Sequence, residues 1–247
     1  MTLTQGHAPP TSLAGRVVLV TGASGGLGAA SARACAAAGA TVVLLGRQVR
    51  KLERVYDVVA AAGPEPLLYP LDLAGATPDD HAELAGRLRS QLGRLDGVLH
   101  CAADFPGLTP LENADPAVLA RSLHVDLTAR LWLSQACLPL LRDRDDAALV
   151  FVVDDPARVG QAYWSGYGIA QHAQRGLVAS LHQETAAGPV RVCGLQPGPM
   201  RTPLRARAFQ HQDDREAADP GRYANACVTL LSASGAVHRG AIWSPCT

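Results

Sequence analysis

A glycine-rich turn near the start of the chain constrains the fold more than any other feature of the sequence. The β-branched run at 17–20 leads directly into the sequence TGASGGLG at 21–28, and an alanine-rich segment follows at 29–38. The turn therefore joins a strand to a helix that we expect to begin near residue 26. The N–H groups at a helix start attract phosphate, and glycines allow its close approach. In this strand–turn–helix setting the turn predicts a diphosphate site, with contacts from Gly22, Ser24, Gly26, Leu27 and Gly28.

The rest of the chain alternates short apolar runs with longer segments of helical periodicity. Strands that are apolar throughout indicate a parallel sheet covered by helices on both faces, since neither face meets water. Right-handed crossovers then give a single-domain α/β fold, a Rossmann-like doubly wound parallel sheet of about seven strands. We expect strands at 17–20, 41–45, 67–71, 97–101, 147–153, 190–195 and 241–244, and helices at 29–38, 49–62, 78–92, 116–141 and 163–187.

Two segments fall outside this alternation. Residues 1–13 are polar and lack the apolar core of a signal peptide, so we expect a flexible tail ahead of a domain at 14–247. Residues 203–222 are also polar and interrupt the succession of strands and helices. We expect a mobile flap of short helix and loop there, which would set the choice of substrate.

Charge and hydropathy exclude several kinds of partner. The 22 basic and 22 acidic side chains balance and are scattered, which gives no electrostatic case for nucleic acid or an anionic membrane surface. No apolar run reaches the roughly 18 residues of a membrane span. We therefore expect a small-molecule substrate and a cytoplasmic location. In keeping with a reducing compartment, we expect free thiols at the six widely spread cysteines: Cys35, Cys101, Cys137, Cys193, Cys227 and Cys246.

The glycine spacing, Gly-x3-Gly-x-Gly after a threonine, resembles the main pattern of the short-chain dehydrogenase/reductase superfamily. The resemblance extends over nearly the whole chain, with further motifs in the same order as in that family. It implies a nicotinamide dinucleotide, with Asp72 and Leu73 beside the adenine and two later stretches around the nicotinamide end. Those stretches contain Cys101, Ala102 and Ala103 after the fourth strand, and Pro197, Gly198, Met200 and Thr202 after the sixth.

The end of the second strand bears on the choice of cofactor. An NAD site places an acidic residue there, which accepts a hydrogen bond from the ribose 2′-hydroxyl. This chain has Arg47 instead, and a guanidinium can grip a 2′-phosphate. We therefore favour NADP(H) over NAD(H). The alternative interpretation of Arg47 is a solvated residue at the start of a helix.

The resemblance also implies four catalytic positions, of which this chain keeps one. Tyr167 stands at the position of the family's acid–base tyrosine. Gln171 replaces the lysine that lowers the tyrosine's pKa, Asp154 replaces the serine that orients the carbonyl, and Asp126 replaces the asparagine of the proton relay. The only lysine in the chain, Lys51, lies near the adenosine end, so no other lysine can take the place of the missing one.

Carboxylates near Tyr167 oppose its ionisation, because an anion destabilises a phenolate. We therefore expect a short-chain-type oxidoreductase with non-standard or low activity on a small carbonyl or imine. Asp154 would then be the acid–base group or the partner of a cationic substrate. The alternative is a catalytically inactive pseudo-enzyme that binds the nucleotide as a sensor or partner protein. A metal site from His124, Asp126, Asp154 and Asp155 is disfavoured, because their spacing fits no known ligand geometry.

The resemblance finally bears on assembly. In this family the two long helices, expected here at 116–141 and 163–187, pack against their copies in another subunit. Their alanine-rich faces in this chain allow close approach, so we expect a homodimer or a homotetramer.

Overall fold

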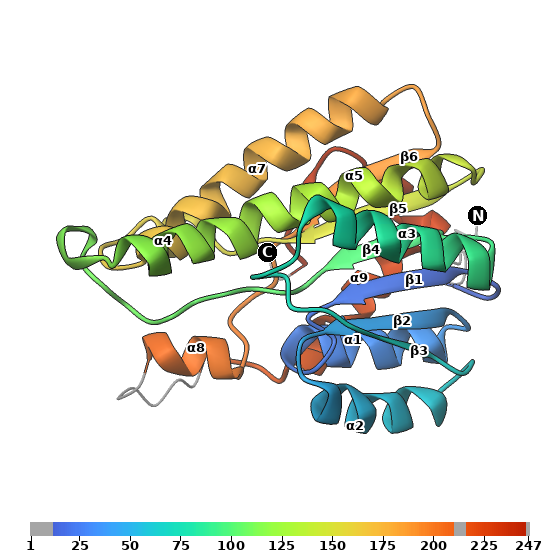
Figure 1. The fold of residues 1–247 in the computed structure, drawn as a ribbon, viewed down its shortest axis with the longest axis horizontal. Helices are drawn as coiled ribbons and strands as arrows, with labels where there is room; N and C mark the ends of the chain where they lie inside the picture. The colour runs from blue at the N-terminus through green and yellow to red at the C-terminus, as the bar shows by residue number, and fades with distance from the viewer. Residues whose placement is uncertain (1–11, 210–215, 246–247) are drawn as a thin grey trace, which may run out of the picture.

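The computed structural model describes residues 12–209 and 216–245. Within these residues, seven parallel strands form a single sheet in the order β3-β2-β1-β4-β5-β6-β7 (Figure 1). The order reverses between β1 and β4, which confirms the predicted Rossmann-like, doubly wound fold. The strands are β1 Val17–Thr21, β2 Thr41–Gly46, β3 Leu67–Pro70, β4 Gly97–His100, β5 Ala147–Val152, β6 Val190–Leu195 and β7 Ile242–Trp243.

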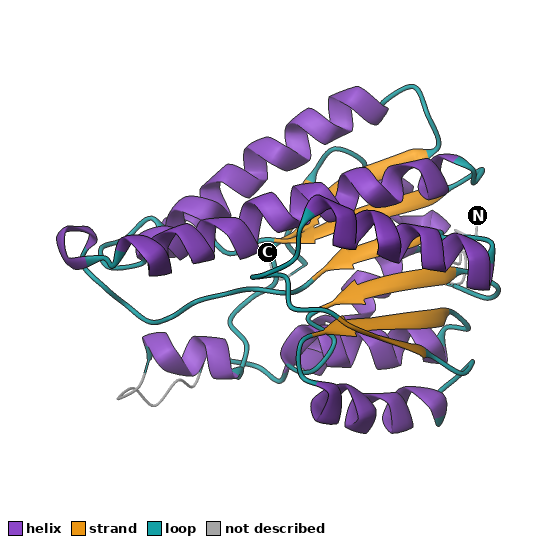
Figure 2. Cartoon of the chain, viewed as in Figure 1, coloured by secondary structure: helices purple, strands orange, loops and turns teal. Residues whose placement is uncertain are grey.

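Helices cover both faces of this sheet, as the uniformly apolar strands predict (Figure 2). Neighbouring strand residues such as Val18 and Leu19 point into two different cores, and both are fully buried. Helices α1, α2 and α9 enclose the first core, whereas α3, α5 and α7 enclose the second. The α-helices are α1 Gly26–Ala37, α2 Val49–Ala60, α3 Pro78–Leu92, α4 Pro116–Leu123, α5 Ala129–Arg142, α6 Pro156–Val159, α7 Ser165–Thr185, α8 Pro203–Ala208 and α9 Ala224–Leu231.

The long helix predicted at 116–141 is divided in the structure. Helix α4 passes into a π-helical turn, η2 (His124–Thr128), which continues into α5. Such a turn accommodates an extra residue in the helix and is frequent at functional sites. Here it carries Asp126, and it is the main departure of the secondary structure from the prediction.

Smaller departures concern the ends of elements. Leu13, which we expected in the tail, is buried and its N–H donates to the carbonyl oxygen of Ala38 at 2.8 Å, so it belongs to the packed domain. Helix α7 begins two residues later than predicted, since Tyr163 has left-handed backbone with φ of 78°. Ser165, the first residue of α7, also has a positive φ, of 45°. Residues 1–11 of the expected tail and 210–215 of the expected flap lie outside the described residues.

Two further predictions concern thiols and membranes. Cys35, Cys101, Cys137, Cys193 and Cys227 are free, and Cys246 lies outside the described residues. None of the helices in the described ranges is long and apolar enough to cross a membrane.

An ion network closes the edge of the sheet opposite the carboxyl ends of the strands. Asp146, just before β5, accepts hydrogen bonds from Arg191 Nε at 2.6 Å and from Arg16 Nη2 at 2.7 Å. Arg191 also donates to the carbonyl oxygens of Leu230 and Ser232 at the end of α9. Burial raises the pKa of Asp146, but the hydrogen bonds from the two arginines outweigh burial and lower it below the ordinary value.

We predict that Asp146→Asn lowers the free energy of unfolding by about 2 kcal/mol at neutral pH, because buried Arg191 loses its carboxylate. The melting temperature should then fall by about 4–8 °C. The folded pKa lies below the ordinary 3.8, so this stabilisation is complete above that pH and is lost as the pH falls through the folded value. The melting temperatures of the parent and the variant, measured by thermal unfolding, should therefore converge in acid.

The control is Asp143→Asn, which removes an exposed ion pair with Arg89. It should change the melting temperature by less than about 3 °C, because exposed pairs contribute little. Equal losses in the two variants would contradict a special role for Asp146.

Candidate functional site

A cavity of about 530 Å³ opens at the carboxyl ends of the strands, where the order reverses between β1 and β4. Open α/β sheets bind ligands at this point, because the loops on either side diverge. Tyr167, Asp154 and Gln171 line this cavity, whereas Asp126 is fully buried behind its wall. All the residues expected to contact a dinucleotide also line it: Gly22, Ser24, Gly26, Leu27, Gly28, Arg47, Asp72, Leu73, Cys101, Ala102, Ala103, Pro197, Gly198, Met200 and Thr202.

The turn after β1 packs directly against the loop after β4. Thr21 Oγ1 accepts hydrogen bonds from the N–H groups of Cys101 and Ala102, both at 3.1 Å. Gly22 has φ of +64°, and a Cβ there would lie 2.7 Å from the backbone nitrogen of Ala102. Only glycine fits this position without moving the loop.

The same turn leaves a cradle on its cavity side. A Cβ on Gly28 would overlap the carbonyl oxygen of Gly22, so α1 starts immediately against the turn. A Cβ on Gly25, by contrast, would meet nothing within 4 Å. The start of α1 is therefore open to a ligand, and its N–H groups and dipole suit a diphosphate. The residues present fit the dinucleotide that the sequence predicts.

The end of the cavity beside β2 carries two basic side chains. Arg47 and Lys51 are exposed and line the wall near Asp72, whose Oδ1 accepts the N–H of Ala74 at 3.1 Å. Two cations and one carboxylate give this end a net positive charge. Such a wall suits an additional phosphate.

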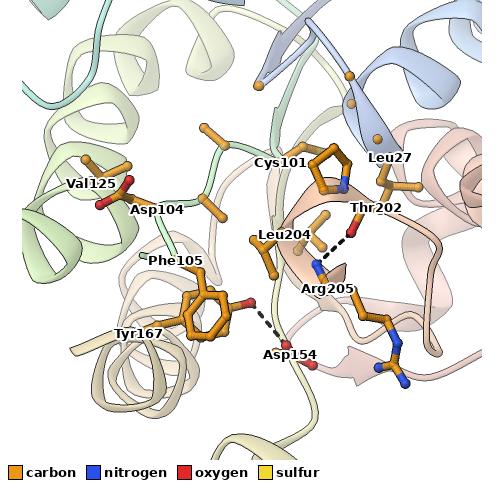
Figure 3. Close-up of a pocket in the computed structure, with 18 of the residues that line it drawn as sticks. Leu27, Cys101, Asp104, Phe105, Val125, Asp154, Tyr167, Thr202, Leu204 and Arg205 are labelled. Atoms are coloured by element: carbon orange, nitrogen blue, oxygen red, sulfur yellow. Dashed lines mark hydrogen bonds between the residues drawn. The ribbon is translucent and has the colours of Figure 1, made fainter. Parts of the chain in front are cut away.

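At the other end of the cavity, Tyr167 points at Asp154 (Figure 3). The Tyr167 hydroxyl donates to Asp154 Oδ2 at 3.1 Å, and Arg158 donates to Asp154 Oδ1. Gln171 Oε1 accepts the backbone N–H of Asp154 at 2.9 Å, which fixes the end of β5 against α7. Burial, followed by the charges of Asp154 and Asp126, raises the pKa of Tyr167 well above its ordinary value. The phenol is therefore protonated at neutral pH.

Asp126 lies behind Tyr167 in the π turn. Its Oδ1 accepts the backbone N–H of Asp104 at 2.9 Å and lies 3.8 Å from Nη2 of Arg130, four residues later. Its Oδ2 is buried and has no hydrogen-bond partner among the described residues. Burial raises the pKa of Asp126 to about 7, although Arg130 opposes the shift. This carboxyl therefore titrates near neutral pH.

Our sequence interpretation placed carboxylates and no lysine near Tyr167, and the structure adds two arginines that it did not foresee. Arg130 follows Asp126 by four residues, and Arg158 follows Asp154 by four, and each arginine pairs with its aspartate. For Asp126 and Arg130 the signal was present in the sequence, because residues four apart lie on one face of a helix. The site is balanced in charge rather than anionic.

An aromatic wall borders the cavity next to Tyr167. Phe105 stacks on Trp164 with ring centroids 5.1 Å apart, and the ring centroids of Tyr167 and Phe105 lie 5.2 Å apart. Trp164 stands between Tyr163 and Ser165, the two non-glycine residues with positive φ in the described chain. Leu204 and Phe209, from α8 and the residue after it, pack against the same cluster.

The residues considered as metal ligands have other partners. Asp155 caps α6 by accepting the N–H of Ala157 at 3.0 Å, and His124 lies edge-on to Trp132. Across residues 12–209 and 216–245, no three His, Cys, Asp or Glu side chains gather in a metal-binding arrangement.

Comparison with known proteins agrees with this architecture. The family profile for short chain dehydrogenases matches residues 16–213. The chain belongs to the short-chain dehydrogenase family. It is 37% identical over 206 residues to the uncharacterized oxidoreductase YciK of Escherichia coli K12. The aligned region covers 83% of this chain and 81% of YciK.

Solved structures of this family superpose closely on the chain. A protein of Pseudomonas syringae described as a short chain dehydrogenase has a TM-score of 0.91 at 38% identity, covering 96% of this chain and 97% of that one. A short chain dehydrogenase from Escherichia coli CFT073, complexed with NADPH, also has a TM-score of 0.91. It is 34% identical, and the match covers 97% of this chain and all of that one.

We predict that Asp126→Asn changes the pH dependence of stability. The pKa of Asp126 in the folded chain, about 7, lies above the ordinary value of 3.8. The folded chain therefore keeps this proton to a higher pH than the unfolded chain does. The resulting stabilisation is present in acid and is lost as the pH rises through 7. Asparagine does not titrate, so the variant does not lose stability in this way. Its free energy of unfolding should therefore improve relative to the parent by on the order of 3 kcal/mol between pH 4 and pH 7. Urea unfolding across this range measures the difference, and parallel pH profiles would show that Asp126 does not titrate there.

Proposed function

We propose that this chain is an NADP(H)-dependent short-chain oxidoreductase that acts on a small carbonyl or imine with non-standard acid–base groups. The observation that carries the proposal is a single cavity with the open glycine cradle at one end and the Tyr167–Asp154–Arg158 arrangement at the other. A related structure contains NADPH, and Arg47 and Lys51 suit the additional phosphate that distinguishes it from NADH.

In this proposal the glycine cradle holds the diphosphate, and Cys101, Ala102 and Ala103 border the nicotinamide end together with the stretch from Pro197 to Thr202. A nicotinamide held there would supply or accept the hydride. The chain's own acid is Tyr167, since its buried phenol remains protonated at neutral pH. A protonated phenol suits reduction, in which the oxygen or nitrogen of the substrate takes up a proton.

Asp154 and Gln171 support Tyr167 in different ways. Asp154 accepts the Tyr167 hydrogen bond and so orients the phenol, while the hydrogen bond from Arg158 holds the Asp154 carboxylate in place. Gln171 holds the backbone of Asp154. The phenol must turn from Asp154 to the substrate when it delivers its proton. We therefore propose slower turnover than in a site where a serine and a lysine serve the tyrosine.

We predict that Arg47→Ala weakens NADPH binding by about 10- to 100-fold, because it removes a charge-assisted contact to the 2′-phosphate. NADH binding should change by less than about threefold, since NADH lacks that phosphate. Fluorescence titration of both nucleotides gives the two constants. The matched control is Arg50→Ala on α2, an exposed arginine outside the cavity lining. An equal effect of both variants would contradict the role of Arg47.

We predict that Tyr167→Phe lowers kcat by at least about 100-fold, the usual contribution of a positioned proton donor. The NADPH dissociation constant should change by less than about threefold, because the phenyl ring remains in the aromatic wall. Turnover is measured by NADPH oxidation with a panel of ketones, aldehydes and cyclic imines. Unchanged kcat in the variant would show that another group supplies the proton.

The second candidate function is nucleotide binding without turnover, as a sensor or partner protein. The observation in its favour is the Tyr167–Asp154 hydrogen bond, which occupies the phenol that the chemistry requires. Tight NADPH binding with no oxidation across the whole panel would favour this candidate. Absence of nucleotide binding would contradict both.

A further inference from the structure

Arg130 on α5 is a buried cation at the wall of the cavity, with a side chain only 1% exposed. Its Nη1 donates to the carbonyl oxygen of Val152 at 3.0 Å and to Gln174 Oε1 at 2.5 Å. Its Nη2 donates to the carbonyl oxygen of Ala102. The guanidinium therefore joins the ends of β4 and β5 to α7, at the edge of the sheet where the cavity opens.

Arg130 and Gln171 reach the same short stretch of backbone. Gln171 accepts the N–H of Asp154, and Arg130 donates to the carbonyl of Val152, two residues earlier. Gln174, the α7 partner of Arg130, lies three residues after Gln171 and so on the same face of that helix. Arg130 from α5 and the side chain at position 171 from α7 therefore hold the same end of β5.

Charged groups from three elements act on Tyr167: Asp154 at the end of β5, Asp126 in η2 and Arg130 on α5. The two carboxylates raise the pKa of Tyr167, and Arg130 lowers it. Arg158 is the hydrogen-bonded partner of Asp154. Arg130 is therefore the cation whose charge favours a phenolate at position 167.

We propose that Arg130 is a positioning residue that supplies, from α5, the fixed positive charge that short-chain dehydrogenases obtain from a lysine at the position of Gln171. It acts through Tyr167: when the phenol gives up its proton, the guanidinium stabilises the anion that remains. An ionised Asp126 partly cancels the charge of Arg130. When Asp126 is protonated, no carboxylate compensates the positive charge of Arg130. The inference rests on the proposed function only in taking Tyr167 as the proton donor.

The test measures the ionisation of position 167 directly, in the protein without nucleotide or substrate. Difluorotyrosine, whose phenol ionises at lower pH than tyrosine, is incorporated at position 167 and titrated by ultraviolet absorbance. The same protein with Tyr167→Phe provides the background from the other tyrosines. Because no ligand is present, a failure of NADP(H) binding cannot affect the result.

The main comparison is Arg130→Met/Asp126→Asn against Asp126→Asn alone, so that no unpaired carboxylate is left buried. Removal of the arginine charge should raise the pKa of the probe by roughly 1 to 2 units, the effect of one nearby charge. Arg130→Lys should keep the probe within about half a unit of the parent, because the charge remains. Arg130→Met/Asp126→Asn/Gln171→Lys, which moves the cation to α7, should return the pKa of the probe toward that of Asp126→Asn alone.

An unchanged probe pKa in Arg130→Met/Asp126→Asn, with a native circular dichroism spectrum, would overturn the proposal. So would an Arg130→Lys protein that titrates like one with no charge at position 130. If the methionine variant does not fold, Arg130→Gln/Asp126→Asn replaces it, since glutamine keeps a donor toward Ala102. The same rise in the pKa of the probe is then expected, and an unchanged pKa would again overturn the proposal.

Discussion

The whole site depends on one backbone contact, where the turn after β1 meets the loop after β4. Thr21 Oγ1 ties Cys101 and Ala102 to the end of β1, and Gly22 leaves no space for a side chain between the two segments. The strand order reverses at this point, so the connections that follow β1 and β4 lead to helices on opposite faces of the sheet. The cavity lies in that divergence, so the two halves of the sheet contribute its two ends.

The end of the cavity around Tyr167 shows how buried charged groups can be paired within short segments of chain. A lone buried carboxylate costs several kcal/mol, and so does a lone buried guanidinium. Here each of Asp126 and Asp154 has an arginine four residues later, so the charges are balanced within short segments of chain. The backbone around them remains that of the family, as the TM-scores of its relatives show.

The sequence was sufficient for the fold and for the lining of the cavity, because both follow from local patterns. Uniformly apolar runs such as 147–153 identify buried parallel strands, and the glycines of the first turn mark the cradle. The inward position of Arg130 was missed for a physical reason, although its spacing of four residues from Asp126 was visible. Arg130 stands in an otherwise apolar stretch, and its partners Ala102, Val152 and Gln174 belong to three other segments. Only the three-dimensional packing shows that this arginine turns inward. The π turn was likewise invisible, since the periodicity on either side of it is helical.

Trp164 has left-handed backbone on both sides, at Tyr163 and Ser165, where side chains other than glycine are disfavoured. Each such residue costs on the order of 1–3 kcal/mol, which the stacking of Trp164 on Phe105 and its burial must offset. The indole is therefore held in one orientation before any ligand arrives. At this part of the wall a ligand meets a surface of fixed shape and is selected there by how well its outline matches the indole, while the Tyr167 hydroxyl beside it still turns.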